Sequence, residues 1–334
     1  MGLKKYFLIG ALIIAAYQFI TSPHVYLDDL GKEMYSKLNE DEIISLQSWA
    51  YHFQGKDIYE TIWNIIFWQE DNIAYDYYGT SLVPNMIMIS IDKKDREIQS
   101  PTETYSKKSG VCIDYALLTA CLLLGLHEDA YIFVIDNKNP ELPGHAFCAV
   151  NISGRFYAID QHAPITDVDS HIKEFLKEHP DLDPSKIRVY HFYIPEDKVY
   201  EVHAKMFKWQ YHPINKKLTP EEKKKIENAI LNYFSKKYHL IPNAKINNME
   251  KMKYLPSGFE KGMSVYQPYE CNLYPEFGEQ YARWLDRRLT GHLTLTEKLK
   301  GEKIDKINFE DWRYIWVKID DKGGYGRIYV YLAN

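Results

Sequence analysis

The most informative stretch of this chain is GVCIDYA, at residues 110–116. We predict a helix over residues 111–124 that Gly125 ends, because an apolar run follows Cys112. A cysteine in the first turn of a helix lies near unpaired backbone N–H groups. The helix dipole there favours the thiolate, which is the reactive form of the side chain. Gly110 lets the backbone approach closely before the helix begins. The pattern alone also fits a cysteine that only packs at a helix start.

A nucleophilic cysteine needs a base and a third group that orients the base. A predicted β-hairpin supplies both, with strands at residues 145–152 and 156–160 around the two-residue turn signal Ser153-Gly154. A two-residue turn makes His145 and Asp160 diagonal neighbours on one face of the hairpin. A three-residue turn would place them on opposite faces, so the register tests the idea.

Two other interpretations involve the same segment. His162 could be the base, although it follows the predicted strand end and precedes Pro164. Cys112, His145, Cys148 and His162 could instead bind zinc. His145 and Cys148 are three residues apart on a predicted strand, so their side chains should point to opposite faces, which disfavours a shared metal. We therefore expect no metal and no cofactor.

Three short segments together resemble the transglutaminase-like superfamily, which has the papain-like cysteine-protease fold. They are residues 100–104 together with 107–116, the Gly144-His145-Ala146-Phe147 motif and the segment 156–160. The resemblance covers about residues 40–195 and implies an α+β core in which the nucleophile helix packs on an antiparallel sheet. It also implies Cys112 as nucleophile, His145 as base and Asp160 as the group that orients His145.

The resemblance further implies a protein or peptide substrate whose peptide or side-chain amide is hydrolysed or transferred to an amine. One oxyanion donor could be the backbone N–H of Cys112, while Gln99 and Tyr105 are guesses for a second donor. Asp114 is interpreted as a first-turn carboxylate that stabilises the helix. A catalytically silent binding or assembly module at the membrane surface is the alternative function.

Composition sets the general class of the protein. The chain has 334 residues, 46% of them hydrophobic and 26% charged, with a net charge of −5. These values are typical of a globular protein of about two domains and exclude a disordered chain or a disulfide scaffold. No basic excess exists to neutralise phosphates, so we expect no nucleic-acid partner. Cys121 and Cys148 lie in apolar runs and are predicted to be core residues.

The N-terminus predicts a membrane anchor at residues 1–22. Lys4 and Lys5 precede an apolar run at residues 6–20, which is near the lower length limit for a spanning helix. A cleaved signal peptide and a buried helix are the alternatives. The positive-inside rule would keep the lysines cytoplasmic and place the bulk of the chain outside the cell membrane. The C-terminal third lies outside the superfamily resemblance and has only a vague likeness to uncharacterised archaeal membrane-anchored proteins.

Outside the motifs we predict a core at residues 23–199 and a C-terminal α+β region of unknown role at residues 200–334. In the core we expect helices near residues 43–53 and 58–72, a loop at residues 100–110, and strands at residues 131–135 and 189–194. In the C-terminal region we expect helices at residues 219–238 and 277–300, a loop at residues 242–275 and a final hairpin. The first helix should bury one face, made of Ile43, Ile44, Leu46, Trp49, Ala50 and Phe53.

Overall fold

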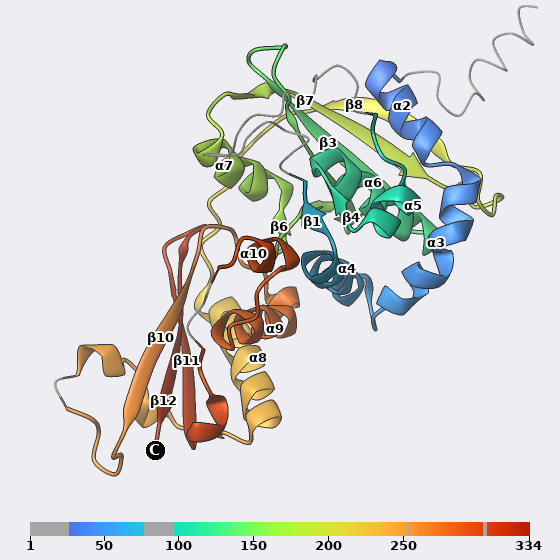
Figure 1. Ribbon diagram of the computed structural model, residues 1–334. Coiled ribbons are helices and arrows are strands. Elements are labelled where there is room, and N and C mark those ends of the chain that lie inside the picture. Colours follow the sequence, from blue (N-terminus) through green and yellow to red (C-terminus); the bar gives the residue numbers. More distant parts are fainter. Residues whose placement is uncertain (1–26, 77–96, 253, 303–305) are drawn as a thin grey trace, which may run out of the picture.

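The computed structural model describes residues 27–76, 97–252, 254–302 and 306–334 (Figure 1). The anchor predicted at residues 1–22 lies outside the described residues. Among the helices that are described, none combines the length and the apolar character needed to cross a membrane. The described chain contains helices and mainly antiparallel sheets, so the predicted α+β class is confirmed.

A six-stranded antiparallel sheet forms the centre of the N-terminal part, in the order β6-β5-β4-β3-β7-β8. Its strands are β3 (Ala130–Asn137), β4 (His145–Ile152), β5 (Arg155–Ile159), β6 (Thr166–Asp167), β7 (Leu182–Tyr193) and β8 (His203–Trp209). Strand β8 begins beyond residue 199, so the sheet continues past the predicted limit of the core. Side chains of successive β3 residues alternate between two apolar clusters, one on each face of the sheet.

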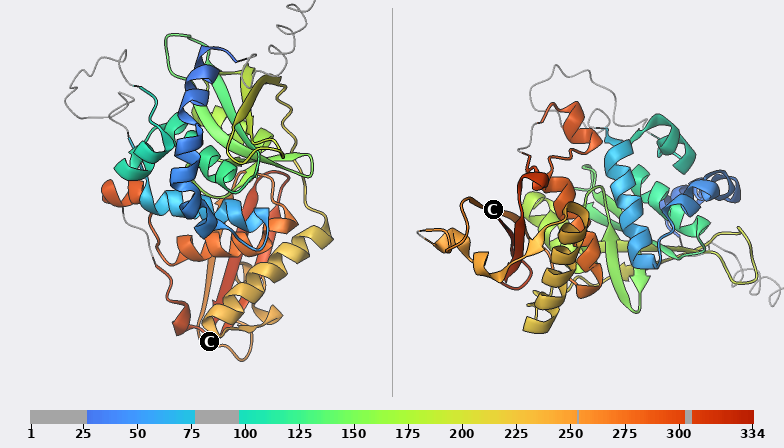
Figure 2. Two further views of the ribbon diagram at one scale, coloured as in Figure 1. Left: turned by 90° about the vertical axis from the view of Figure 1, so that its right-hand side faces the viewer. Right: turned by 90° about the horizontal axis from the view of Figure 1, so that it is seen from below.

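Helices cover both faces of this sheet (Figures 1 and 2). Helix α6 (Cys112–Gly125) packs on the face that carries Ile132 and Cys148, whereas α7 (Val168–Glu178) packs on the face that carries Phe133 and Phe147. Four further helices contribute to the apolar cluster on the same side of the sheet as α6: α2 (Asp29–Lys37), α3 (Glu40–Phe53), α4 (Ile58–Asn72) and α5 (Pro101–Lys107). Two short parallel strands, β1 (Ala74–Tyr75) and β2 (Ser109–Gly110), join the end of α4 to the start of α6.

The predicted face of α3 is only partly correct. Asn39 caps the helix by accepting a hydrogen bond from the Glu42 backbone N–H, and Phe53 is buried. Ile44 and Trp49, however, are 47% and 40% exposed. The buried face of α3 is therefore narrower than the apolar face predicted from the sequence.

The loop predicted at residues 100–110 is wrong, because residues 101–107 form α5. Ser100 accepts a hydrogen bond from the Glu103 N–H, and the Glu103 side chain accepts one from the Ser100 N–H. Pro101 occupies the first helical turn, where its missing N–H costs nothing. The sequence therefore carried a capping signal that outweighs the polar composition of the segment.

The predicted role of Gly125 as a helix stop is also wrong. Helix α6 includes Gly125, and the left-handed residue beyond its end is His127, with a φ of 60°. A Cβ at position 125 would lie 3.3 Å from the Ala50 Cβ of α3. Gly125 therefore serves the close packing of two helices rather than a cap.

The C-terminal part contains a four-stranded sheet in the order β10-β12-β11-β9. The helices and strands of this part are α8 (Pro220–Tyr238), β9 (Ile241–Pro242), β10 (Gly262–Tyr269), α9 (Gly278–Leu289), α10 (Leu295–Leu299), β11 (Tyr314–Asp321) and β12 (Gly326–Ala333). Helix α8 begins where the sequence predicted, with Thr219 as its cap, and the final hairpin is as predicted. Strand β10 corrects the predicted loop at 242–275. The single helix predicted at 277–300 is two helices, separated by Gly291 with a φ of 75°.

The two parts share one apolar core. Trp63 of α4 is fully buried, and its ring lies 5.7 Å from those of Phe277 and Tyr281 in the C-terminal part. One cluster of buried apolar side chains extends from the N-terminal helices to β12. Figure 2 shows α9 beside the N-terminal part, whereas α8 packs against α9 and extends along the four-stranded sheet.

Candidate active site

The N-terminus of α6 carries the predicted nucleophile. Cys112 is the first residue of the helix and is half-buried. No side chain caps the helix at Val111, and the backbone N–H of Val111 donates to Asp114 Oδ2 at 2.9 Å. Asp114 is fully buried and also accepts a hydrogen bond from the Gln99 N–H at 3.0 Å. A Cβ at Gly110 would lie 2.8 Å from the Asp114 Cβ, so the missing side chain permits this closed turn.

The predicted register of the hairpin is confirmed. Ser153 and Gly154 both have positive φ, at 52° and 85°, and Ile152 pairs directly with Arg155. This is the two-residue turn that fits the twist of antiparallel strands. It brings His145, at the start of β4, to Asp160, which follows the end of β5. The distance from His145 Nε2 to Asp160 Oδ2 is 2.7 Å.

His145 interacts with both predicted partners. Its Nε2 faces Asp160, which leaves Nδ1 as the nitrogen for the nearby Cys112 side chain. Burial opposes a charge on the imidazole, but the Asp160 carboxylate and the Cys112 thiol together raise the pKa of His145 well above 6.5. Burial likewise opposes ionisation of Asp160, yet His145 and His171 hold the pKa of its carboxyl below 3.8. The site therefore favours an imidazolium beside a carboxylate.

His171 is a member of this site that the sequence analysis missed. It lies on α7, and its Nε2 is 3.0 Å from Asp160 Oδ2. Two phenylalanines fix the imidazole rings: Phe175 stacks on His145 with centroids 3.9 Å apart, and Phe147 meets His171 edge to face at 4.7 Å. Asp167 caps α7 and signals a helix start, but no spacing in the sequence connects His171 to Asp160.

The alternative residues lie elsewhere. His162 lines a cavity of about 390 Å³, and it is not one of the two histidines that hydrogen-bond to Asp160. Cys148 is buried against α6, on the opposite face of β4 from His145, so the zinc set considered from sequence is not assembled. The Gln99 amide donates to Asp114 Oδ2 at 3.3 Å, and Tyr105 stacks on Trp68. Both guesses for an oxyanion donor thus make structural contacts.

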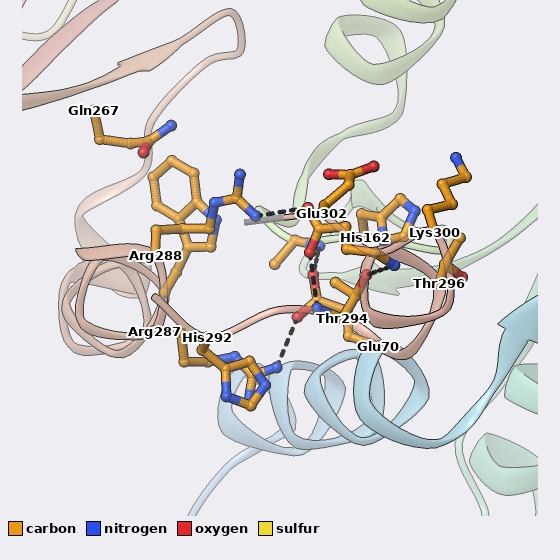
Figure 3. Close-up of a pocket in the computed structure, with 13 residues that line it drawn as sticks. Glu70, His162, Gln267, Arg287, Arg288, His292, Thr294, Thr296, Lys300 and Glu302 are labelled. Carbon is orange, nitrogen blue, oxygen red and sulfur yellow. Dashed lines mark hydrogen bonds and ion pairs between the residues drawn. The ribbon is translucent and has the colours of Figure 1, made fainter. Parts of the chain in front are cut away.

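The cavity that His162 lines lies between α4 and the helices α9 and α10 (Figure 3). Its charged groups largely pair with each other. Glu70 accepts hydrogen bonds from the Ala163 N–H at 2.9 Å and from Arg287 at 3.2 Å, while Arg288 pairs with Glu297 at 3.0 Å. Burial raises the pKa of Glu70 to about 7, although Ala163 and Arg287 oppose the shift. The Glu70–Arg287 pair joins the two parts of the molecule.

Comparison with known proteins agrees with the geometry. Residues 44–190 match the family profile of a transglutaminase-like domain. The chain carries a transglutaminase-like domain. This span includes Cys112, His145, Asp160 and His171, and it ends within β7. The resemblance seen in the sequence motifs is therefore confirmed, and so is the transglutaminase-like α+β fold.

Relatives of the chain extend beyond the transglutaminase-like domain. A UPF0252 protein of Archaeoglobus fulgidus is 27% identical over 75% of this chain and 76% of its own length. A UPF0252 protein of Pyrococcus horikoshii is 27% identical over 83% of this chain and 81% of its own. A solved structure from Cytophaga hutchinsonii, provisionally named a cysteine protease, has 19% identity and a TM-score of 0.28, with 58% of this chain and 61% of that chain covered.

Proposed function

We propose that this protein is a cysteine enzyme that acts on peptide or side-chain amides through Cys112, His145 and Asp160. The observation that carries the proposal is the position of His145. This buried imidazole has its Nε2 2.7 Å from a buried carboxylate, and it also interacts with the half-buried Cys112 side chain at a helix N-terminus. This arrangement supports Cys112 as the nucleophile, His145 as the base and Asp160 as the group that orients the base in thiol-dependent acyl transfer.

The first half-reaction forms an acyl-enzyme. His145 Nδ1 takes the proton of Cys112, and the resulting thiolate forms a bond between Sγ and the amide carbon. The carbonyl oxygen becomes an oxyanion, which the backbone N–H of Cys112 at the start of α6 can stabilise. The C–N bond then breaks, and the imidazolium returns the proton to the leaving amine. Asp160 keeps the proton-bearing Nε2 in place throughout.

The second half-reaction releases the acyl group. His145 removes a proton from a water or an amine, which attacks the thioester carbon and expels the Cys112 thiolate. Water gives a carboxylic acid, and an amine gives a new amide. The same three side chains serve both outcomes, because only the second nucleophile differs.

The proposed location is the outer face of the cell membrane, with residues 1–22 as the anchor. The basis is the apolar run at residues 6–20 behind Lys4 and Lys5. Protease added to intact cells should then digest the chain beyond Asp28, and complete protection of that part would contradict the proposed topology.

Selective labelling tests the enzymatic proposal. We expect iodoacetamide at neutral pH to modify the full-length chain at Cys112 and at no other cysteine. Cys121, Cys148 and Cys271 are buried, and burial raises the pKa of each thiol. Cys112→Ala should abolish labelling, and His145→Ala should slow it by at least about tenfold. Mass spectrometry of the adduct measures both effects.

A second histidine provides the matched control. His191 of β7 is also buried, and its Nε2 lies 2.7 Å from the Asp129 carboxylate. His191→Ala removes a similar pair and should leave the labelling of Cys112 unchanged. If Cys112 reacts equally fast in the wild-type and His145→Ala chains, the enzymatic proposal is wrong and a binding module becomes the better account.

A further inference from the structure

The Asp160 carboxylate has one more imidazole than a catalytic triad needs. Oδ2 lies 2.7 Å from His145 Nε2 and 3.0 Å from His171 Nε2. All three atoms lie within 4.8 Å of one another. The two histidines come from different elements, β4 and α7, on the same face of the sheet. One orienting carboxylate between two inward-facing imidazoles needs a second explanation.

We propose that His145, Asp160 and His171 form a binding site for a divalent transition-metal ion, with Zn²⁺ as the ion that the donor set fits best. The ligand atoms are the two Nε2 atoms and one or both oxygens of Asp160. Two imidazoles and a carboxylate, with a fourth position for water, are a recurrent set of zinc ligands. This set shares only His145 with the zinc ligands considered from the sequence.

The surroundings of the three side chains fit such a site. Their exposed fractions are 6% for His145, 10% for Asp160 and 21% for His171, so the ligands are largely shielded from water. Asp160 Oδ1 is buried and has no hydrogen-bond partner among the described residues, which leaves its lone pairs available to a cation. A metal with bonds of about 2.0–2.2 Å holds its ligands roughly 3.3 Å apart. The carboxylate therefore needs only a small shift to admit the ion.

Aromatic packing already orients the imidazoles. Phe175 stacks on the His145 ring, and Phe147 contacts the His171 ring. These contacts restrict ring rotation and lower the entropy that metal binding would otherwise cost. The arrangement is the kind of support that metal-ligating histidines require from the residues around them.

The metal would act as an inhibitor of the proposed enzyme, and this consequence rests on the proposed function. A metal on Nε2 of His145 needs the lone pair of that nitrogen, so the single proton of the neutral imidazole must move from Nε2 to Nδ1. Nδ1 then has no free lone pair for the Cys112 proton, so the thiol loses its base. Catalysis would resume when a chelator removes the ion.

Metal binding can be measured without any substrate. The full-length chain, prepared without a polyhistidine tag, is titrated with Zn²⁺ in competition with a chromophoric chelator. We expect one ion per chain, and His171→Ala should weaken binding by more than about tenfold. Cys112→Ala should leave affinity unchanged, and so should His52→Ala, which removes an exposed histidine of α3. Circular dichroism checks that each variant is folded.

X-ray absorption at the zinc edge identifies the ligands. The expected spectrum contains nitrogen and oxygen neighbours, with the signature of two imidazoles and no sulfur. Stoichiometric binding that survives His171→Ala, a sulfur neighbour, or no binding by the wild-type chain would each overturn the inference.

The two proposals fail separately. If the chain is labelled at Cys112 but binds no zinc, only the proposed metal site is wrong. If the chain binds zinc through His171 but Cys112 is unreactive, the metal site is supported and the proposed enzymatic function is wrong.

Discussion

At the scale of single residues, burial of the carboxylate decides how it affects a neighbouring histidine. His145 and His191 are both buried and both lie 2.7 Å from an aspartate. The pKa of His145 is raised above 6.5, whereas burial lowers the pKa of His191 below that value despite the opposing effect of Asp129. Asp129 is 50% exposed and Asp160 only 10%. Water therefore screens the attraction between Asp129 and His191, whereas the attraction between Asp160 and His145 is only weakly screened.

This contrast predicts the effect of Asp160→Asn. The substitution keeps the shape of the side chain and removes its charge, so burial alone should govern His145 and lower its pKa below 6.5. An NMR titration of the histidine ring protons measures the shift, and His191 in the same spectrum is the internal control. An unchanged pKa of His145 would mean that the carboxylate is not the cause of the shift.

The same pair links stability to pH. Since the pKa of His145 is higher in the folded chain than in the unfolded one, its stabilising contribution is complete below about pH 6.5. The contribution is lost as pH rises through the folded-state pKa. The depressed pKa of Asp160 adds a contribution that is present above about pH 3.8 and decreases as pH falls further.

At the scale of elements, the start of β4 is the most constrained point of the site. Gly144 precedes His145, and a Cβ there would lie 2.2 Å from the backbone oxygen of Ile135 on β3. Neither atom can move without shifting a strand. The glycine therefore sets how closely β4 approaches β3 at the residue that positions the imidazole.

Gly144→Ala should thus affect stability and reactivity together. We expect a loss of about 1–3 kcal/mol in the free energy of unfolding, typical of overpacking, and slower labelling of Cys112. Gly154→Ala is the comparison: its φ of 85° makes an alanine cost about 1 kcal/mol, but no atom lies within 4 Å of the new Cβ and the turn is at the other end of the hairpin. If both variants slow labelling equally, Gly144 has no special role.

Local signals explain which elements the sequence predicted. The hairpin register followed from Ser153-Gly154, and α8 followed from Thr219 and Pro220, because turn and cap chemistry acts over a few residues. Strand β10 was missed because its pairing with β12 joins distant parts of the chain, and its residues resemble a loop in composition. His171 was missed for the same reason: its contact with Asp160 depends on how α7 packs on the sheet.

At the scale of the whole molecule, charged groups tie the C-terminal part to the transglutaminase-like domain. Arg287 of α9 donates to both oxygens of Asp71, at 2.8 and 3.0 Å, and to Glu70 at 3.2 Å. Glu70 is only 7% exposed. Losing the arginine would leave that carboxylate buried with one backbone partner.

Arg287→Ala should therefore destabilise the protein in a pH-dependent way. The raised pKa of Glu70, about 7, means that its stabilising contribution is present below about pH 4.5 and is lost as pH rises through 7. We expect a loss on the order of 3 kcal/mol at about pH 8, when Glu70 must ionise, and about 1 kcal/mol at about pH 5. Chemical denaturation at the two pH values measures the difference.

Lys56→Ala is the matched control, because Lys56 pairs with Glu279 of α9 across the same boundary at 2.9 Å. Both side chains are more than half exposed, so the loss should stay under about 1 kcal/mol at either pH. An equal effect of the two substitutions would show that burial of Glu70 does not matter.

The burial of Trp63 by Phe277 and Tyr281 has a practical consequence for anyone who dissects this protein. A fragment trimmed to the residues with a recognisable family signature would leave a large indole and its neighbours facing water, and such a surface promotes aggregation. Failure of that fragment to react would then say nothing about the chemistry of the intact chain. The C-terminal third is best regarded as a built-in scaffold, to be retained in every assay.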